Sequence, residues 1–125
     1  MNSTDARLRI NRVLRDGEQS LIFEEALALL HTDPELRMIP GSRNTPVWVA
    51  VTPVRLMEVG SNDHITSARW ADMASLGVHK AGRKWQYQWQ HHTQKIPYAP
   101  IQVGQPFAEL LQGIQAGRVP VSALP

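Results

Sequence analysis

Residues 84–92 constrain the fold most, because aromatic and polar side chains alternate strictly along this segment. One set of alternate positions holds Trp85, Tyr87, Trp89 and His91. The other set holds Lys84, Gln86, Gln88, Gln90 and His92. A period of two is that of a β-strand, whose successive side chains point to opposite faces. The chain must therefore build a sheet, and the aromatic set is the natural face to bury.

Other short segments predict further strands. Residues 47–51 are apolar and largely β-branched, as in a buried strand, and residues 54–59 follow after Pro53 as a second strand or as the same strand bent. Residues 101–103 predict a short strand. Residues 6–15 alternate basic and apolar side chains and indicate a half-buried strand, with a helix as the alternative.

Three segments have the periodicity and boundary signals of helices, at residues 21–31, 64–76 and 106–116. Apolar residues recur in them at three- and four-residue spacing. The expected boundary residues, which are N-caps, a first-turn proline and helix-ending glycines, are Ser20, Asn62 or Asp63, Gly77, Pro106 and Gly117. The sequence therefore predicts an α+β fold with a small antiparallel or mixed sheet and about three helices packed on it.

Length and composition predict one globular domain over residues 1–125. The absence of cysteine excludes disulfides, thiolate nucleophiles and cysteine-ligated metal centres, and it is compatible with a reducing compartment. The first residues lack the pattern of a secretory signal, and no apolar run is long enough for a membrane span. We therefore expect a cytoplasmic protein that does not associate with membranes.

The uneven distribution of charge is more informative than the net charge of +2. Residues 1–35 contain seven acidic residues and four arginines, whereas residues 36–125 contain nine basic and four acidic residues. No acidic residue occurs between Met73 and Ala108. Residues 79–95 are therefore predicted to face an anionic partner.

The predicted binding residues combine the cations and aromatic rings of this region. They are Lys80, Arg83, Lys84, Trp85, Tyr87, Trp89, His91 and Lys95. If the rings are exposed, they provide a surface on which nucleotide bases stack while the cations meet phosphates. If the rings form the core face of the sheet, the opposite polar face is left for a polyanion or an acidic protein surface.

Motifs for metal binding and catalysis are weak. The chain has five histidines, but adjacent His91 and His92 on a strand are expected to point to opposite faces, so no metal site is predicted. The sequence lacks a nucleophile elbow and a phosphate-binding glycine loop. Glu24 and Glu25 are interpreted as the solvated face of a helix. No catalytic residue and no cofactor are predicted.

These observations favour a small non-catalytic binding module or accessory factor whose partner is a nucleic acid or a protein. The alternative is a small-molecule-binding or enzymatic α+β domain, with a pocket lined by tryptophan and histidine. A third possibility is a homodimer in which residues 84–92 form an edge strand that pairs with its copy.

Overall fold

The structure, a computed structural model, describes residues 2–15, 17–29, 45–60, 65–93, 95 and 99–121. Its helices are α1 (Ser3–Val13), the 3-10 helix η1 (Trp70–Asp72) and α3 (Gln105–Gln115). Its strands are β1 (Ile22–Ala28), β2 (Thr45–Val51), β3 (Arg55–Gly60), β4 (Ile65–Arg69), β5 (Met73–Ala81), β6 (Lys84–His91) and β7 (Ile101–Val103). All seven strands join one antiparallel sheet in the order β4-β3-β2-β1-β7-β6-β5.

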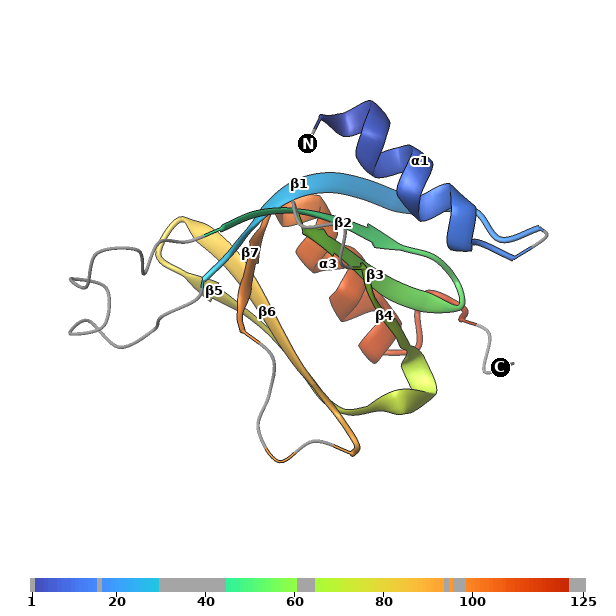
Figure 1. The fold of residues 1–125 in the computed structure, drawn as a ribbon. Coiled ribbons are helices and arrows are strands. Elements are labelled where there is room, and N and C mark those ends of the chain that lie inside the picture. Colours follow the sequence, from blue (N-terminus) through green and yellow to red (C-terminus); the bar gives the residue numbers. More distant parts are fainter. Residues whose placement is uncertain are drawn as a thin grey trace.

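The sheet curls around α3, and α1 lies on its outer face (Figure 1). Fully buried Phe107 of α3 stacks on Tyr87 of β6, with ring centroids 5.8 Å apart, in the main core on the inner face. A smaller cluster lies on the outer face, where Ile10 of α1 packs with Ala50 and Met57. The sheet is thus covered by one helix on each side.

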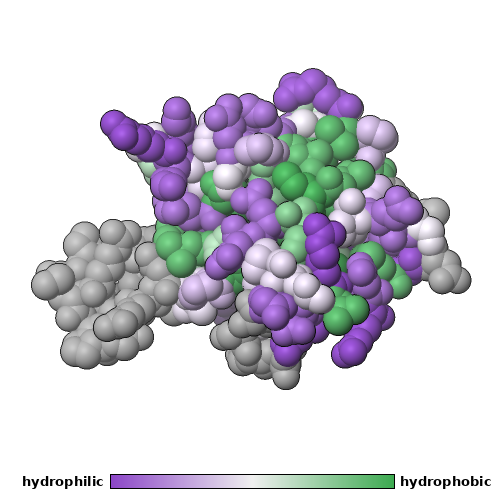
Figure 2. Space-filling view, turned by 90° about the horizontal axis from the view of Figure 1, so that it is seen from above, coloured by the Kyte–Doolittle hydropathy of each residue, from purple (hydrophilic) through white to green (hydrophobic). Residues whose placement is uncertain are grey.

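Figure 2 shows the outer face from above, where hydrophilic side chains surround an apolar area. Leu8 and Val13 of α1, and Leu21 just before β1, are large apolar side chains that remain exposed. None of the helices in the described part of the chain has the length and apolar character needed to span a membrane.

Several sequence predictions are confirmed. β6 covers the alternating segment, β2 and β3 are separate strands on either side of Pro53, and β7 occupies the predicted residues. α3 begins one residue before Pro106, and Gly117 follows it with a φ of 75°, a left-handed conformation that glycine adopts without steric cost. The α+β class is therefore correct.

The predictions of a small sheet and of about three helices are wrong, because the described residues form seven strands and two α-helices. The helix predicted over residues 21–31 is strand β1 as far as it is described, and residues 30–31 lie outside the described part. β1 is held between β2 and β7, where Phe23 lies opposite Ala50 and Leu27 lies opposite both Pro46 and Gln102. This pairing on two sides overrides a local sequence rich in helix formers.

The prediction of a helix over residues 64–76 is also wrong. This region forms β4, η1 and the start of β5, and its proposed caps, Asn62 and Asp63, lie outside the described residues. Gly77 continues β5 opposite Gln88 and ends no helix. The apolar residues whose spacing suggested a helix lie on different strands and faces: Met73 and Leu76 of β5 pack against the main core, and Ile65 of β4 packs against the smaller cluster on the outer face.

The strand indicated at residues 6–15 is helix α1, which was the stated alternative. Asn2 caps it by accepting a hydrogen bond from the Asp5 N–H at 2.8 Å. Ala6 and Ile10, four residues apart, are its two buried side chains. Of the residues between them, Arg7 and the apolar Leu8 are exposed and Arg9 is partly buried, so the alternation of basic and apolar residues does not follow the burial.

A polar network joins the segment after α1 to the β2–β3 turn. Arg55 donates to both carboxylate oxygens of Glu18, at 3.1 and 2.7 Å, and to the Val13 carbonyl at 2.7 Å. The Thr52 hydroxyl donates to Glu18 at 2.6 Å. Burial raises the pKa of Glu18, but hydrogen bonds from Arg55, Thr52 and the Arg15 backbone outweigh it and lower this pKa to about 2.

Candidate functional site

A cavity of about 430 Å³ opens where β7 ends and the chain turns into α3. β7 pairs with both β1 and β6, but it ends at Val103. Past this residue the space between β1 and β6 is not bridged, and it opens toward the turn of the β5–β6 hairpin. The lining residues come from β1, the hairpin, β7 and the first residues of α3. They are Glu25, Ala26, Leu27, Lys80, Arg83, Lys84, Trp85, Gln102, Val103, Gly104 and Gln105.

Four of the predicted binding residues meet at this cavity, namely Lys80, Arg83, Lys84 and Trp85. Lys80 lies opposite Trp85 in the hairpin register, and Gly82 makes the turn with a φ of 65°. The three cationic residues are exposed, and Trp85 is half-buried. The hairpin therefore presents three exposed cations and one half-buried aromatic ring to a single space.

The two adjacent glutamates do not form the solvated face of a helix, because they lie on β1 and point to opposite faces of the sheet. Glu24 accepts a hydrogen bond from the Gly104 N–H at 2.9 Å and so ties the β7–α3 connection to β1. Glu25 is exposed and lines the cavity. Among the described lining residues, one carboxylate thus faces three cations.

Tyr87 and Trp89 belong to the core. Their exposed fractions are 0% and 1%, and they pack on the inner face of the sheet beneath α3. The aromatic face of β6 is therefore the buried face, and these two rings cannot receive nucleotide bases. The Gln86, Gln88 and Gln90 side chains lie on the opposite face and are partly exposed.

Glu58 of β3 is a buried carboxyl group beside these rings. It accepts a hydrogen bond from the Tyr87 hydroxyl at 2.8 Å. Burial raises the pKa of Glu58, and hydrogen bonds from Tyr87 and Trp89 offset only part of this effect. Burial also raises the pKa of Tyr87 well above its usual value, with the Glu58 charge as the next cause. As a whole residue, Glu58 is half-buried by its accessible surface, and it is not among the residues that line the cavity.

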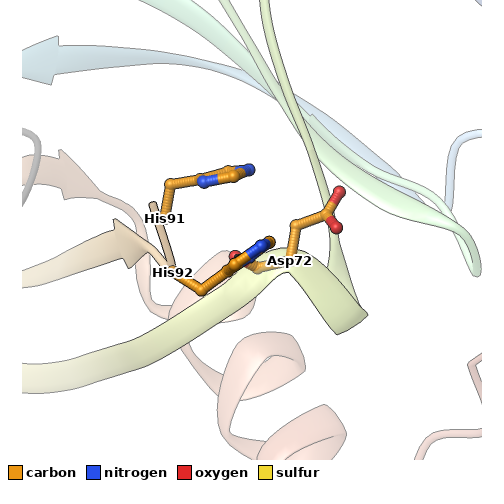
Figure 3. Close-up of side chains that lie close together, drawn as sticks. All are labelled: Asp72, His91 and His92. Carbon is orange, nitrogen blue, oxygen red and sulfur yellow. Dashed lines mark hydrogen bonds between the residues drawn. The ribbon is translucent and has the colours of Figure 1, made fainter. Parts of the chain in front are cut away.

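His91 lies at the far end of β6, roughly 23 Å from Lys84 at about 3.3 Å per residue. Its ring stacks on that of His92, with centroids 4.5 Å apart, and Asp72 lies beside them (Figure 3). The expectation that the two rings point to opposite faces is therefore wrong, because His92 follows the last residue of β6 and is no longer bound by the strand alternation. Lys95 is exposed and does not line the cavity.

Sequence reasoning missed the cavity residues outside the hairpin, as well as Glu58 and Asp72. A signal for Glu58 exists, because it shares the parity of inward-facing Leu56 on an apolar strand, where a charged residue is unusual. Gln102 and Gly104 carry no comparable local signal, since only the pairing of β7 with β1 and β6 brings them to the hairpin.

Comparison with known proteins supports the fold alone. No protein-family model matches the chain, and no curated protein does. A solved structure, described as the C-terminal domain of an unknown protein from Leishmania infantum, matches with a TM-score of 0.55 and 10% sequence identity. The match covers 90% of this chain and 92% of that chain, so nearly the whole architecture is shared.

Proposed function

We propose that this chain is a small non-catalytic binding module or accessory factor that recognises an anionic group on a nucleic-acid or protein partner. The observation that carries this proposal is the convergence of Lys80, Arg83 and Lys84 around the cavity beside Trp85. Exposed cations gathered at a concave site attract phosphates and carboxylates and accelerate encounter with them. The predicted cytoplasmic location is part of the same proposal.

The burial of Tyr87 and Trp89 limits the number of rings on which a partner can stack. An extended stacking surface needs several exposed rings, and here Trp85 alone of the three β6 rings is accessible. The site therefore suits one or two anionic groups with a single stacking contact. Gln102 and Gln105 supply amide groups at the same cavity, which can hydrogen-bond to the bound group.

Titration of fluorescently labelled single-stranded and duplex nucleic acid at low and moderate salt tests the proposal first. We expect micromolar or tighter binding that weakens with salt. The double variant Arg83→Ala/Lys84→Ala should weaken binding about 10-fold and reduce the salt slope by about two units, one for each lost phosphate contact. The exposed pair Arg12→Ala/Arg118→Ala removes the same charge away from the cavity and serves as the control.

The outcomes separate the partners. Equal loss in both double variants would show that net charge, and not the cavity, determines binding. No binding to any nucleic acid at low salt would reject a nucleic-acid partner, and the same variants would then be tested against an acidic peptide. Failure of both probes would reject the hairpin cavity as a binding site for macromolecules.

A small anionic ligand is a second candidate, because the cavity volume falls in the range of small-molecule sites. The described lining includes Trp85 but no histidine, so the tryptophan and histidine pocket expected for an enzyme is not assembled here. A rise in melting temperature with inorganic phosphate or a mononucleotide, lost in Arg83→Ala/Lys84→Ala, would favour this candidate.

A further inference from the structure

The backbone brings Asp72, His91 and His92 together from two separate segments. Met73 pairs with His91 across β5 and β6, and the register shifts between Met73 and Ser75. The His92 N–H then donates to the Asp72 carbonyl at 3.0 Å, which holds η1 against the end of β6. Bulges of this kind redirect side chains at the ends of strands. The cluster is therefore formed where the pairing of β5 with β6 becomes irregular and η1 meets the end of β6.

Each of the three residues places one potential metal-binding atom within 4.8 Å of the other two. In Figure 3 the two imidazole rings lie one above the other, with Asp72 alongside. Tetrahedral zinc with bonds of about 2.0–2.1 Å needs ligand atoms about 3.3 Å apart. His92 is exposed, so rotation of its ring and that of half-buried His91 can supply the remaining approach.

Hydrogen bonds already orient the two rings. His92 Nδ1 lies 3.0 Å from the Asp72 carbonyl, which can only accept, so Nδ1 carries the proton and Nε2 keeps a free lone pair. His91 Nδ1 lies 2.7 Å from the Thr93 hydroxyl and 3.1 Å from the Thr93 N–H. Because the Thr93 N–H donates to Nδ1, His91 Nε2 carries the ring proton in this structure. Metal binding at Nε2 moves that proton to Nδ1, which then donates a hydrogen bond to the Thr93 hydroxyl and loses the one from the Thr93 N–H. Such outer contacts are the rule for metal-bound histidine.

The Asp72 carboxylate is also held in place. Arg69 Nε and Nη2 donate to its two oxygens, at 2.9 and 3.2 Å, and each oxygen keeps a further lone pair. This two-pronged pairing with a guanidinium favours the charged form of the carboxyl group. Two imidazole nitrogens and one carboxylate oxygen suit zinc, nickel and copper.

We propose that Asp72, His91 and His92 bind one divalent transition-metal ion of the zinc class. Water completes its coordination, because the cluster lies at the surface. The ion ties the β4–β5 connection to the end of β6, two segments that already meet through the Asp72 carbonyl. This site is separate from the cavity lined by Lys80, Arg83 and Lys84, which lies at the other end of the same hairpin.

Isothermal titration calorimetry of the whole chain with zinc chloride at neutral pH tests this site. We expect one ion per chain, and a melting temperature that rises with zinc concentration as ligand linkage requires. His91→Ala/His92→Ala should abolish both effects. Asp72→Asn should lower the affinity by more than the roughly 10–100-fold that loss of an outer-shell partner costs.

His79→Ala is the matched control, since His79 is an exposed histidine near the opposite end of the hairpin. It should leave zinc binding unchanged, and far-ultraviolet circular dichroism should show that all variants fold. Absence of zinc binding to the wild type would overturn the proposal. So would binding that persists in His91→Ala/His92→Ala, or that is the same in Asp72→Asn as in the wild type.

Discussion

At the scale of single residues, Glu58 shows how burial changes the chemistry of a side chain. Its carboxyl group lies on the inner face of the sheet, with the Tyr87 hydroxyl as a hydrogen-bond donor. A buried carboxylate is costly unless it is protonated or well paired, and Glu58 has hydrogen-bond donors but no cationic partner among its described contacts. Ionisation of Glu58 therefore lowers the stability of the folded protein at neutral pH.

Replacing Glu58 by Gln tests this. Burial raises the pKa of Glu58 above its value of about 4.5 in the unfolded chain, so the folded state binds the proton more tightly. The stabilising effect of the protonated Glu58 carboxyl group is complete below about pH 4.5 and is lost as the pH rises through the pKa of the folded state. Between pH 5 and 8, we expect the free energy of unfolding of Glu58→Gln to increase by about 1 kcal/mol relative to that of the wild type. Urea unfolding measures this difference. Parallel pH profiles of the two proteins would contradict this expectation.

At the scale of elements, the β5–β6 hairpin carries both proposed sites. Its turn brings Arg83 and Lys84 back toward Lys80 and Trp85, and the turn depends on Gly82 with its positive φ. The opposite end of the hairpin joins the His91 and His92 rings to η1. β6 is paired on both sides, with β5 and β7, so it is not the edge strand of the homodimer considered from the sequence.

Gly82→Ala should destabilise the protein by about 1 kcal/mol. A Cβ at this position meets nothing within 4 Å, so the cost comes from the left-handed backbone and not from a clash. Gly77→Ala is the control, because Gly77 lies in β5 and its added Cβ makes only an ordinary contact, 4.0 Å from the Gln88 carbonyl. Chemical denaturation should show no loss for Gly77→Ala. Equal losses in the two variants would show that the turn conformation is not the cause.

At the scale of the whole molecule, the Arg55 and Glu18 ion pair connects parts that are distant in sequence. Arg55 of β3 reaches the end of α1 through the Val13 carbonyl, the segment before β1 through Glu18, and β4 through the Ser67 hydroxyl. The Glu18 side chain is 2% exposed and that of Arg55 is 14% exposed. A pair enclosed to this degree couples α1 to the sheet.

Glu18→Gln should therefore change the acid stability of the entire fold. The wild-type pKa is about 2 in the folded chain against 4.5 ordinarily, so the stabilisation is complete above about pH 4.5 and is lost as pH falls toward 2. We expect the variant to lose about 3 kcal/mol at neutral pH, because Arg55 stays buried without its partner. Its stability should also fall less between pH 4.5 and 2.

Thermal unfolding across this pH range measures both effects. Glu25→Gln, at an exposed carboxyl group on β1, is the control and should follow the wild-type curve. An acid limb of unchanged steepness in Glu18→Gln would show that other carboxyl groups cause the acid unfolding.

Local sequence determined the elements whose signals agree at short range. The alternation of residues 84–92, the β-branched run of β2, and the proline and glycine around α3 each specify their element within about ten residues. The same applies to the four predicted binding residues that meet at the cavity, because Lys80, Arg83, Lys84 and Trp85 lie around the turn of one hairpin. Neighbours in a hairpin are close in space whatever the rest of the fold does.

Tertiary structure decided what depends on distant partners. β1 is a strand because β2 and β7 pair with it on both sides, although its own residues favour a helix. The alternation of β6 favoured burial of its aromatic face, but only the docking of α3 decided what covers Tyr87 and Trp89. The meeting of Asp72 with His91 and His92 follows from the pairing of β5 with β6. Strand pairing and core packing are long-range interactions, and no local pattern encodes which partner a segment will find.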